Sequence, residues 1–252
     1  MPVVVKICGL CNADDVRAVA ALRPDALGFV FWAKSKRAVR AEDVAAWTRG
    51  LPAGIWKVGV FVDNPPEEIA RIVGAAGLDV VQRHGFQTLE KSAPNFPTIG
   101  KNEADFSNGW KNTSEKFPMV GKNDSEFSNG WKNRPPGSGA RAVKLWQVVH
   151  LGREEPPDES AASVDAFLVD SYSADSPGGT GRVGDWAAAA DFVRRCRTPV
   201  LLAGGLTPDN VAEALRAVRP WGVDISSGVE RAPRRKDLEK VQRFIRTCRE
   251  SA

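Results

Sequence analysis

The sequence predicts an α/β protein, a single (β/α)8 TIM barrel that spans residues 1–252. Three observations lead to this prediction. Eight short apolar runs recur along the chain, segments with helical periodicity follow most of them, and no hairpin signal joins consecutive runs. Strands that alternate with helices form parallel sheets, and eight such strands close most economically into one barrel.

The apolar runs and the amphipathic segments give the expected elements in order. Strands are expected at residues 3–8, 26–31, 56–62, 78–82, 143–149, 164–170, 199–203 and 221–226. Helices are expected at residues 13–22, 41–47, from 65 onward, 185–196, 211–218 and about 236–249. Asn12, Asn64 and Thr207 are expected to cap the helices that follow them, because their side-chain oxygens can accept from the free N–H groups of a first turn.

The alternation breaks between about residues 86 and 141, where a fourth helix would be expected. Residues 91–139 are instead predicted to be an irregular insertion with a tandem repeat of period 21, at about 92–112 and 113–133. Two copies are too few for a solenoid. Their near-identity favours recent duplication or design over a natural binding elaboration. Arg83, which alternation turns toward the outer layer, also indicates that this layer is no longer an apolar helix.

Composition and charge disfavour several classes of protein. No apolar run reaches membrane-spanning length and the N-terminus lacks a signal pattern, so no membrane partner and a cytoplasmic location are expected. The net charge of +4 is small and spread along the chain, so a small anionic substrate is expected rather than nucleic acid. The four cysteines lack the spacing of a zinc set, so no metal is expected.

The predicted strand ends bring chemically capable side chains to one mouth of the barrel, where active sites of this fold lie. They are Cys8, Arg37, Gln82, His84 and Asp170. By residue type alone, Cys8 would be a buried core thiol. Arg37 could be a solvated charge in a basic loop, and His84 a hydrogen-bonded residue at a strand end. Their clustering at one mouth favours a site.

Two glycine-containing loops at the same mouth predict a phosphate site. Gly204 and Gly205 follow the seventh strand, and Ser226, Ser227 and Gly228 follow the eighth. Barrels often bind phosphate here, through backbone N–H groups and a helix N-terminus. Either loop alone could be an ordinary turn of left-handed backbone, but the two together favour phosphate.

Ordered motifs across most of the chain closely resemble the phosphoribosylanthranilate isomerase family of tryptophan biosynthesis. The first half carries Lys6 to Leu10, Gly28 to Phe31, Lys34 to Arg37, Val58 to Phe61 and Val81 to Gly85. The second half carries Leu168 to Asp170, Gly178 to Gly181, Asp185 to Trp186, Ala203 to Leu206 and Val223 to Glu230. The resemblance covers the chain except residues 86–142 and implies the same barrel fold.

The resemblance implies a cofactor-independent Amadori rearrangement of a phosphosugar amine, in a monomer or homodimer. Asp170 would be the general acid that opens the furanose ring, and Cys8 the general base that takes the proton from the sugar C2. The acid requires a raised pKa and the base a lowered one, for which Lys6 is a candidate cause. Arg37 would bind the anthranilate carboxylate, a task that suits a guanidinium fork. Gln82 and His84 share a strand face and would line the site.

Two other functions are compatible with the sequence. The chain could be a related aminoaldose isomerase of histidine biosynthesis, but that family is expected to use paired aspartates, and the first strand here ends in Cys8. It could also be an inactivated or engineered barrel that displays the inserted repeat.

Overall fold

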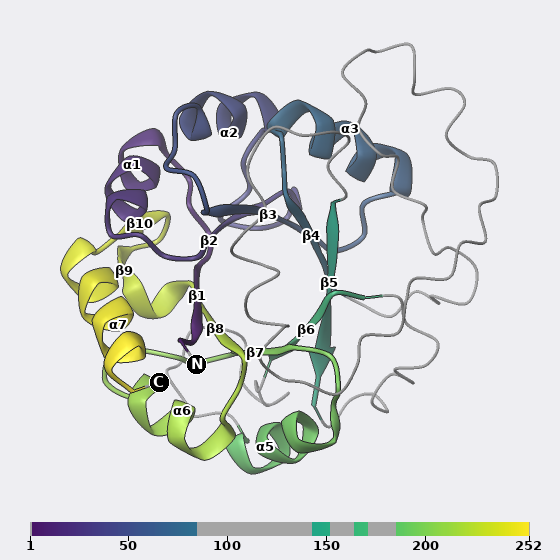
Figure 1. Ribbon diagram of the computed structural model, residues 1–252. Helices are drawn as coiled ribbons and strands as arrows, with labels where there is room; N and C mark the ends of the chain where they lie inside the picture. Colours follow the sequence, from purple (N-terminus) through teal and green to yellow (C-terminus); the bar gives the residue numbers. More distant parts are fainter. Residues whose placement is uncertain (1, 85–142, 152–163, 171–184, 252) are drawn as a thin grey trace.

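The computed structural model describes residues 2–84, 143–151, 164–170 and 185–251. Eight parallel strands form a closed barrel in sequence order, because β1 pairs with both β2 and β8 (Figure 1). The strands are β1 Val4–Ile7, β2 Ala26–Val30, β3 Trp56–Phe61, β4 Val80–Arg83, β5 Lys144–His150, β6 Ala166–Asp170, β7 Val200–Ala203 and β8 Gly222–Ile225. The predicted (β/α)8 barrel is confirmed.

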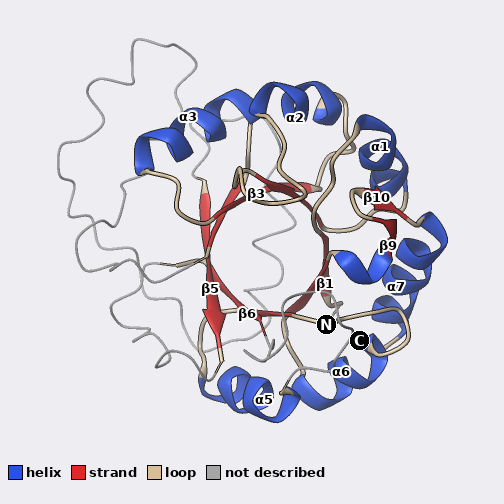
Figure 2. Cartoon of the chain, turned by 180° about the vertical axis from the view of Figure 1, so that it is seen from behind, coloured by secondary structure: helices blue, strands red, loops and turns tan. Residues whose placement is uncertain are grey.

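Helices form a ring around the outside of the barrel (Figure 2). They are α1 Ala13–Ala21, α2 Ala41–Thr48, α3 Pro66–Ala76, α5 Trp186–Arg195, α6 Val211–Val218 and α7 Leu238–Glu250. Each predicted helix is confirmed with small changes at its ends. The predicted insertion at residues 91–139, its repeat and the replacement of the fourth helix lie outside the described residues.

Two of the three predicted caps are wrong. Asn12 accepts from Asp15 N at 2.9 Å and caps α1 as expected. Asn64 does not cap α3: Pro65 takes the cap position, and the Asn64 amide instead donates from Nδ2 to the Phe31 carbonyl at 3.3 Å. Thr207 caps a separate turn just before α6, where its hydroxyl accepts from Asp209 N and Asn210 N at 3.3 Å each.

Alternation along the strands divides the core into two layers. Side chains that point outward pack between the strands and the helices, and they include Val5, Ile7, Leu27 and Phe29. Side chains that point inward fill the barrel: Ala26, Val58, Val80, Trp146, Val148, Ala166, Leu168, Leu201 and Ala203. Burial of apolar surface in both layers is the main force that closes the barrel.

Three tryptophans fill the end of the barrel where the strands begin. Trp146 is fully buried and meets Trp56 and Trp221 edge to face, with ring centroids 6.1 and 6.3 Å apart. Trp56 and Trp221 stack on each other at 6.4 Å. Because the apolar rings occupy this end, the polar inward side chains are left for the opposite mouth.

A hairpin that the sequence reading did not predict follows β8. A 3-10 turn, Ser227–Val229, leads into β9 Glu230–Ala232, which pairs antiparallel with β10 Arg235–Lys236. Arg234 makes the connecting turn with a positive φ of 71°. The hairpin lies beside α1 and β2, so the last loop of the barrel reaches the first two (Figure 1).

The tryptophan cluster predicts a large loss of stability for Trp146→Ala. Removing a fully buried indole leaves a cavity among the inward side chains that they cannot fill, and a loss of about 3–5 kcal/mol is expected. Urea unfolding followed by circular dichroism measures the loss. Leu238→Ala, at an exposed apolar side chain, is the control and should change stability by less than about 0.5 kcal/mol. A Trp146→Ala loss as small as the control's would contradict the packing described above.

Candidate active site

Cys8 lies directly after β1 and faces the barrel interior. Its N–H donates to the Ile225 carbonyl at 2.8 Å, and the side chain is 6% exposed. Gly28 on β2 leaves the space that the thiol occupies, because a Cβ at that position would lie 2.7 Å from the Cys8 sulfur. The glycine is therefore part of how the site is built.

An ion pair between a fully buried lysine and a largely buried aspartate lies beneath Cys8. Lys6, two residues earlier on the same inward face, is 0% exposed, and its Nζ lies 2.8 Å from Asp224 Oδ1 on β8. Burial alone would lower the pKa of Lys6, but the Asp224 carboxylate and the nearby Cys8 more than offset it and raise the pKa above its ordinary value. Lys6 is thus a permanent positive charge below the thiol.

The expected lowering of the Cys8 pKa is wrong. Burial removes the thiolate from water and raises the pKa. Lys6 and Lys236 pull it down, but together they do not offset the burial. The resting side chain is therefore a neutral thiol, and the two ammonium groups stabilise the thiolate once it forms.

Arg37 lies in the loop after β2 and forms a two-pronged ion pair with Glu230 of β9. Its Nε and Nη2 donate to the two carboxylate oxygens at 2.7 and 2.6 Å. This pairing raises the pKa of Arg37. Gly9 makes room for the arginine, because a Cβ on Gly9 would lie 2.5 Å from Arg37 Cδ and 2.8 Å from Ser226 Oγ. Cys8, Arg37 and Ser226 are thus brought together around Gly9.

Lys236 is a second buried cation at this mouth. Its Nζ donates to the Ser226 carbonyl at 2.9 Å and lies 3.4 Å from Glu230 Oε1. Burial lowers the pKa of Lys236, and the Glu230 carboxylate only partly offsets it. Burial would raise the pKa of Glu230, but Arg37 and Lys236 bring it below its ordinary value, so the carboxylate is charged.

Gln82 of β4 and His84, which directly follows β4, point inward and touch each other. Gln82 Nε2 lies 3.3 Å from His84 Nε2, and the His84 ring lies 6.1 Å from the ring of His150, measured between centroids. Burial, with help from His150 and Lys6, lowers the pKa of His84 to about 4. His84 is therefore neutral at neutral pH.

Asp170 is the last residue of β6, on the wall beside these histidines. It stands opposite His150 of β5 and Ala203 of β7 in the strand register. Alternation from Ala166 and Leu168, which lie inside the barrel, turns Asp170 to the same inward side. The carboxyl group of Asp170 and the thiol of Cys8 thus lie at the ends of different strands, β6 and β1, on different sides of one mouth.

The two predicted phosphate loops lie against each other. Gly204 and Gly205 have positive φ angles of 89° and 65°, which glycine adopts without strain. A Cβ on Gly228 would lie 2.1 Å from the Leu206 carbonyl oxygen, so the loops after β7 and β8 meet at this glycine. Ser227 opens the short 3-10 turn at the same place.

Comparison with known proteins identifies the family. A family model described as N-(5'phosphoribosyl)anthranilate (PRA) isomerase matches residues 5–105 and 139–247. The chain belongs to this family. The gap between the two matched ranges lies within the predicted insertion. An N-(5'-phosphoribosyl)anthranilate isomerase of Pelobacter propionicus is 37% identical over 247 residues, which cover 98% of this chain and 96% of the relative. One of Acetivibrio thermocellus is 36% identical, with the same coverage.

Solved structures of the phosphoribosylanthranilate isomerase family share the fold. The Thermotoga maritima enzyme is 28% identical, with a TM-score of 0.67 over 98% of this chain and 99% of that one. A phosphoribosyl anthranilate isomerase crystallised with reduced 1-(o-carboxyphenylamino)-1-deoxyribulose 5-phosphate is 27% identical, with a TM-score of 0.64 and the same coverage. Fold and sequence therefore both agree with this family over most of the chain.

The sequence reading missed several polar residues of the mouth in this family member. His150 falls one residue beyond the predicted fifth strand, although alternation from Trp146 and Val148 would have turned it inward. Asp224 and Glu230 appeared only within a motif, and Lys236 only as the expected start of the last helix, whereas it lies in β10. Their partners Lys6 and Arg37 are more than 190 positions away in sequence, so no local pattern indicates the pairing.

In the part of the chain that the structure describes, no helix is long and apolar enough to cross a membrane.

All four cysteines have free thiols, and burial raises the pKa of Cys248 to about 12. Cys248 is an inert core thiol, unlike Cys8, which reaches the mouth.

The lowered pKa of His84 predicts a loss of stability in mild acid. In the unfolded chain His84 is protonated below about pH 6.5, whereas in the folded chain it stays neutral down to about pH 4. The free energy of unfolding therefore falls as the pH drops between these values. His84→Gln removes this contribution. Between pH 7 and pH 5 the wild type should lose about 2 kcal/mol more than the variant, measured by urea unfolding. Equal losses in the two proteins would show that His84 titrates normally.

Proposed function

We propose that this chain catalyses the Amadori rearrangement of N-(5'-phosphoribosyl)anthranilate to 1-(2-carboxyphenylamino)-1-deoxyribulose 5-phosphate, the isomerase reaction of tryptophan biosynthesis. One observation carries the proposal: in a member of this family, the thiol of Cys8 faces a barrel mouth that also holds buried cations and an inward carboxyl group. The reaction needs a proton donor and a proton acceptor on one anionic sugar, and the mouth offers both.

Ring opening is the first step, and Asp170 is its acid. The carboxyl group gives a proton to the furanose ring oxygen, and the bond between that oxygen and C1 breaks. The lone pair of the anthranilate nitrogen forms the new C1–N double bond of a Schiff base. Asp170 is left as a carboxylate. Its position at the end of β6, on a wall away from Cys8, supports separate roles for the two groups.

Proton removal from C2 is the second step, and Cys8 is its base. The thiolate takes the C2 proton, and the electron pair moves through C1 to the iminium nitrogen to give an enaminol. Protonation at C1 and loss of the hydroxyl proton at O2 then give the ketose. The raised pKa of Cys8 makes its thiolate a rarer species but a stronger base. Lys6, charged and directly below, offsets the negative charge of the thiolate.

The anionic ends of the substrate fit the two sides of the mouth. Arg37 binds the anthranilate carboxylate, with the guanidinium edge that Glu230 does not occupy. Backbone N–H groups around Gly204, Gly205, Ser226, Ser227 and Gly228 bind the phosphate. Gln82 and neutral His84 line the wall between these ends, where they can hydrogen-bond sugar hydroxyls.

Several features of the proposal remain predictions. The reaction is internal to one substrate, so no cofactor or metal is expected, and the partner is the phosphosugar rather than nucleic acid. The chain is expected to be a monomer or a homodimer; one of the similar structures is described as that of monomers derived from the dimeric Thermotoga maritima enzyme. The histidine-pathway alternative is disfavoured because Cys8 stands where that family is expected to use an aspartate.

The mechanism predicts that Cys8→Ser and Asp170→Asn each lower kcat by at least about 100-fold, because each removes one proton-transfer group. The assay follows the loss of fluorescence of freshly made phosphoribosylanthranilate. Reduced 1-(o-carboxyphenylamino)-1-deoxyribulose 5-phosphate should bind both variants with nearly wild-type affinity, since neither substitution removes a binding contact.

Cys196→Ser is the matched control, because this thiol lies at the end of α5 and donates to the Thr198 carbonyl instead of facing the mouth. It should keep wild-type kcat. Full activity in Cys8→Ser or Asp170→Asn would overturn the assigned roles. A well-folded wild type without activity would instead favour the inactivated barrel that displays the inserted repeat.

A further inference from the structure

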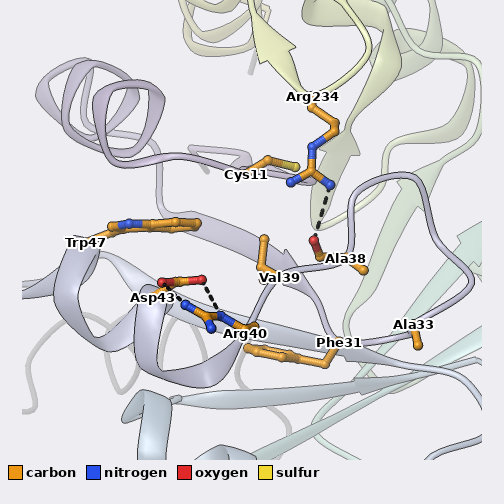
Figure 3. A pocket seen from close by; sticks show the side chains of 9 residues that line it. All are labelled: Cys11, Phe31, Ala33, Ala38, Val39, Arg40, Asp43, Trp47 and Arg234. Carbon is orange, nitrogen blue, oxygen red and sulfur yellow. Dashed lines mark hydrogen bonds and ion pairs between the residues drawn. The ribbon is translucent and has the colours of Figure 1, made fainter.

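The loop that carries Arg37 is not tightly packed on its outer side. Between the loop and α2 lies a cavity of about 500 Å³, with Ala33, Ala38 and Val39 of the loop on one side and Trp47 of α2 on another (Figure 3). Arg234 from the β9–β10 hairpin reaches over its rim (Figure 3). The loop therefore borders an open pocket on this side, and its polar contacts help to hold it in position.

Three consecutive carbonyls of this loop are held by side chains from other loops. Arg234 Nη1 donates to the carbonyls of Lys36 and Ala38, at 2.8 and 3.3 Å. The thiol of Cys11 lies 3.6 Å from the carbonyl of Arg37, between them in sequence. The backbone on both sides of Arg37 is thereby tied to the hairpin and to the loop after β1.

The side chain of Arg37 is held by the same hairpin. Glu230, whose side chain is 7% exposed, engages the Nε and Nη2 edge of the guanidinium. A guanidinium has five N–H donors, so the edge formed by Nη1 and Nη2 keeps donors for a second carboxylate. Because Glu230 already holds the Arg37 guanidinium in place, this side chain loses little conformational freedom when it binds a second carboxylate.

The hairpin itself is anchored at three points. The Lys236 N–H donates to Asp15 of α1 at 2.9 Å, and Lys240 Nζ of α7 donates to the Glu230 carbonyl at 3.2 Å. Lys236 Nζ also joins Glu230 to the Ser226 carbonyl in the loop after β8. One short segment thus connects the Arg37 fork with the loop proposed to bind phosphate.

We propose that the hairpin Glu230–Lys236 is the specificity element of this site, and that Glu230 and Arg234 are positioning residues that aim the second edge of Arg37 at the ring carboxylate of the substrate. This inference rests on the proposed function. The carboxylate is then recognised by an arginine aimed before the ligand arrives. Lys236 balances the charge of Glu230 and holds the two ends of the mouth at a fixed separation.

The preference for a carboxylated ligand tests this role. The two probes are reduced 1-(o-carboxyphenylamino)-1-deoxyribulose 5-phosphate and the same compound without its carboxyl group, with affinities measured by calorimetry. The wild type should bind the carboxylated probe about 10- to 100-fold more tightly, as a charge-assisted contact allows. In Glu230→Gln the preference should fall below about threefold, while the affinity for the decarboxylated probe stays unchanged.

Arg234→Ala is the second variant, chosen because Arg234 is an exposed residue whose loss spares the core. It should reduce the preference by about three- to tenfold and raise KM for phosphoribosylanthranilate with little change in kcat. Arg231→Ala is the matched control, since Arg231 is exposed on the same hairpin. It should keep the wild-type preference.

The outcomes separate this inference from the proposed function. An unchanged preference in both Glu230→Gln and Arg234→Ala would overturn the inference while the function stands. Equal weakening of both probes would also overturn it, because it would indicate a general structural role. A wild type that binds neither probe and turns over no substrate would refute the proposed function itself.

Discussion

The site depends on one buried ion pair at the place where the barrel closes. Lys6 of β1 and Asp224 of β8 are paired in the strand register, and their side chains meet inside the barrel at 2.8 Å. Loss of either partner would leave an uncompensated buried charge, which typically costs about 3–5 kcal/mol. The pair therefore favours the register that joins the first strand to the last, and that register sets the height of Cys8 in the mouth.

Around this pair, the buried cations of the mouth are paired with carboxylates, while Cys8 and His84 are neutral. Lys6 and Arg37 stay charged beside Asp224 and Glu230. Burial shifts the pKa values of Cys8 and His84 in opposite directions, upward for the thiol and downward for the imidazole, so both are uncharged at neutral pH. Such an arrangement suits an anionic substrate and internal proton transfer, since negative charge that arrives or develops meets cations already in place.

The fold and the residues at the strand ends could be predicted from the sequence, because both depend on local signals. Each buried strand is an apolar run, and residues such as Cys8 and Asp170 stand at the strand ends. The directions of the pKa shifts could not be predicted from local signals. The Cys8 pKa is raised because tertiary packing, including the space left by Gly28, removes the thiol from water. The pairing of Arg37 with Glu230 was also hidden, because the two residues are 193 positions apart.

The ionisation of Cys8 tests the account most directly. The ultraviolet absorbance of the thiolate, followed against pH as the difference between wild type and Cys8→Ser, reports this one group. In protein without added substrate, the midpoint of the Cys8 titration should lie above 9.0, the ordinary pKa of a cysteine thiol. A midpoint below that value would mean that Lys6 and Lys236 outweigh burial, and it would contradict a mouth whose base rests as a neutral thiol.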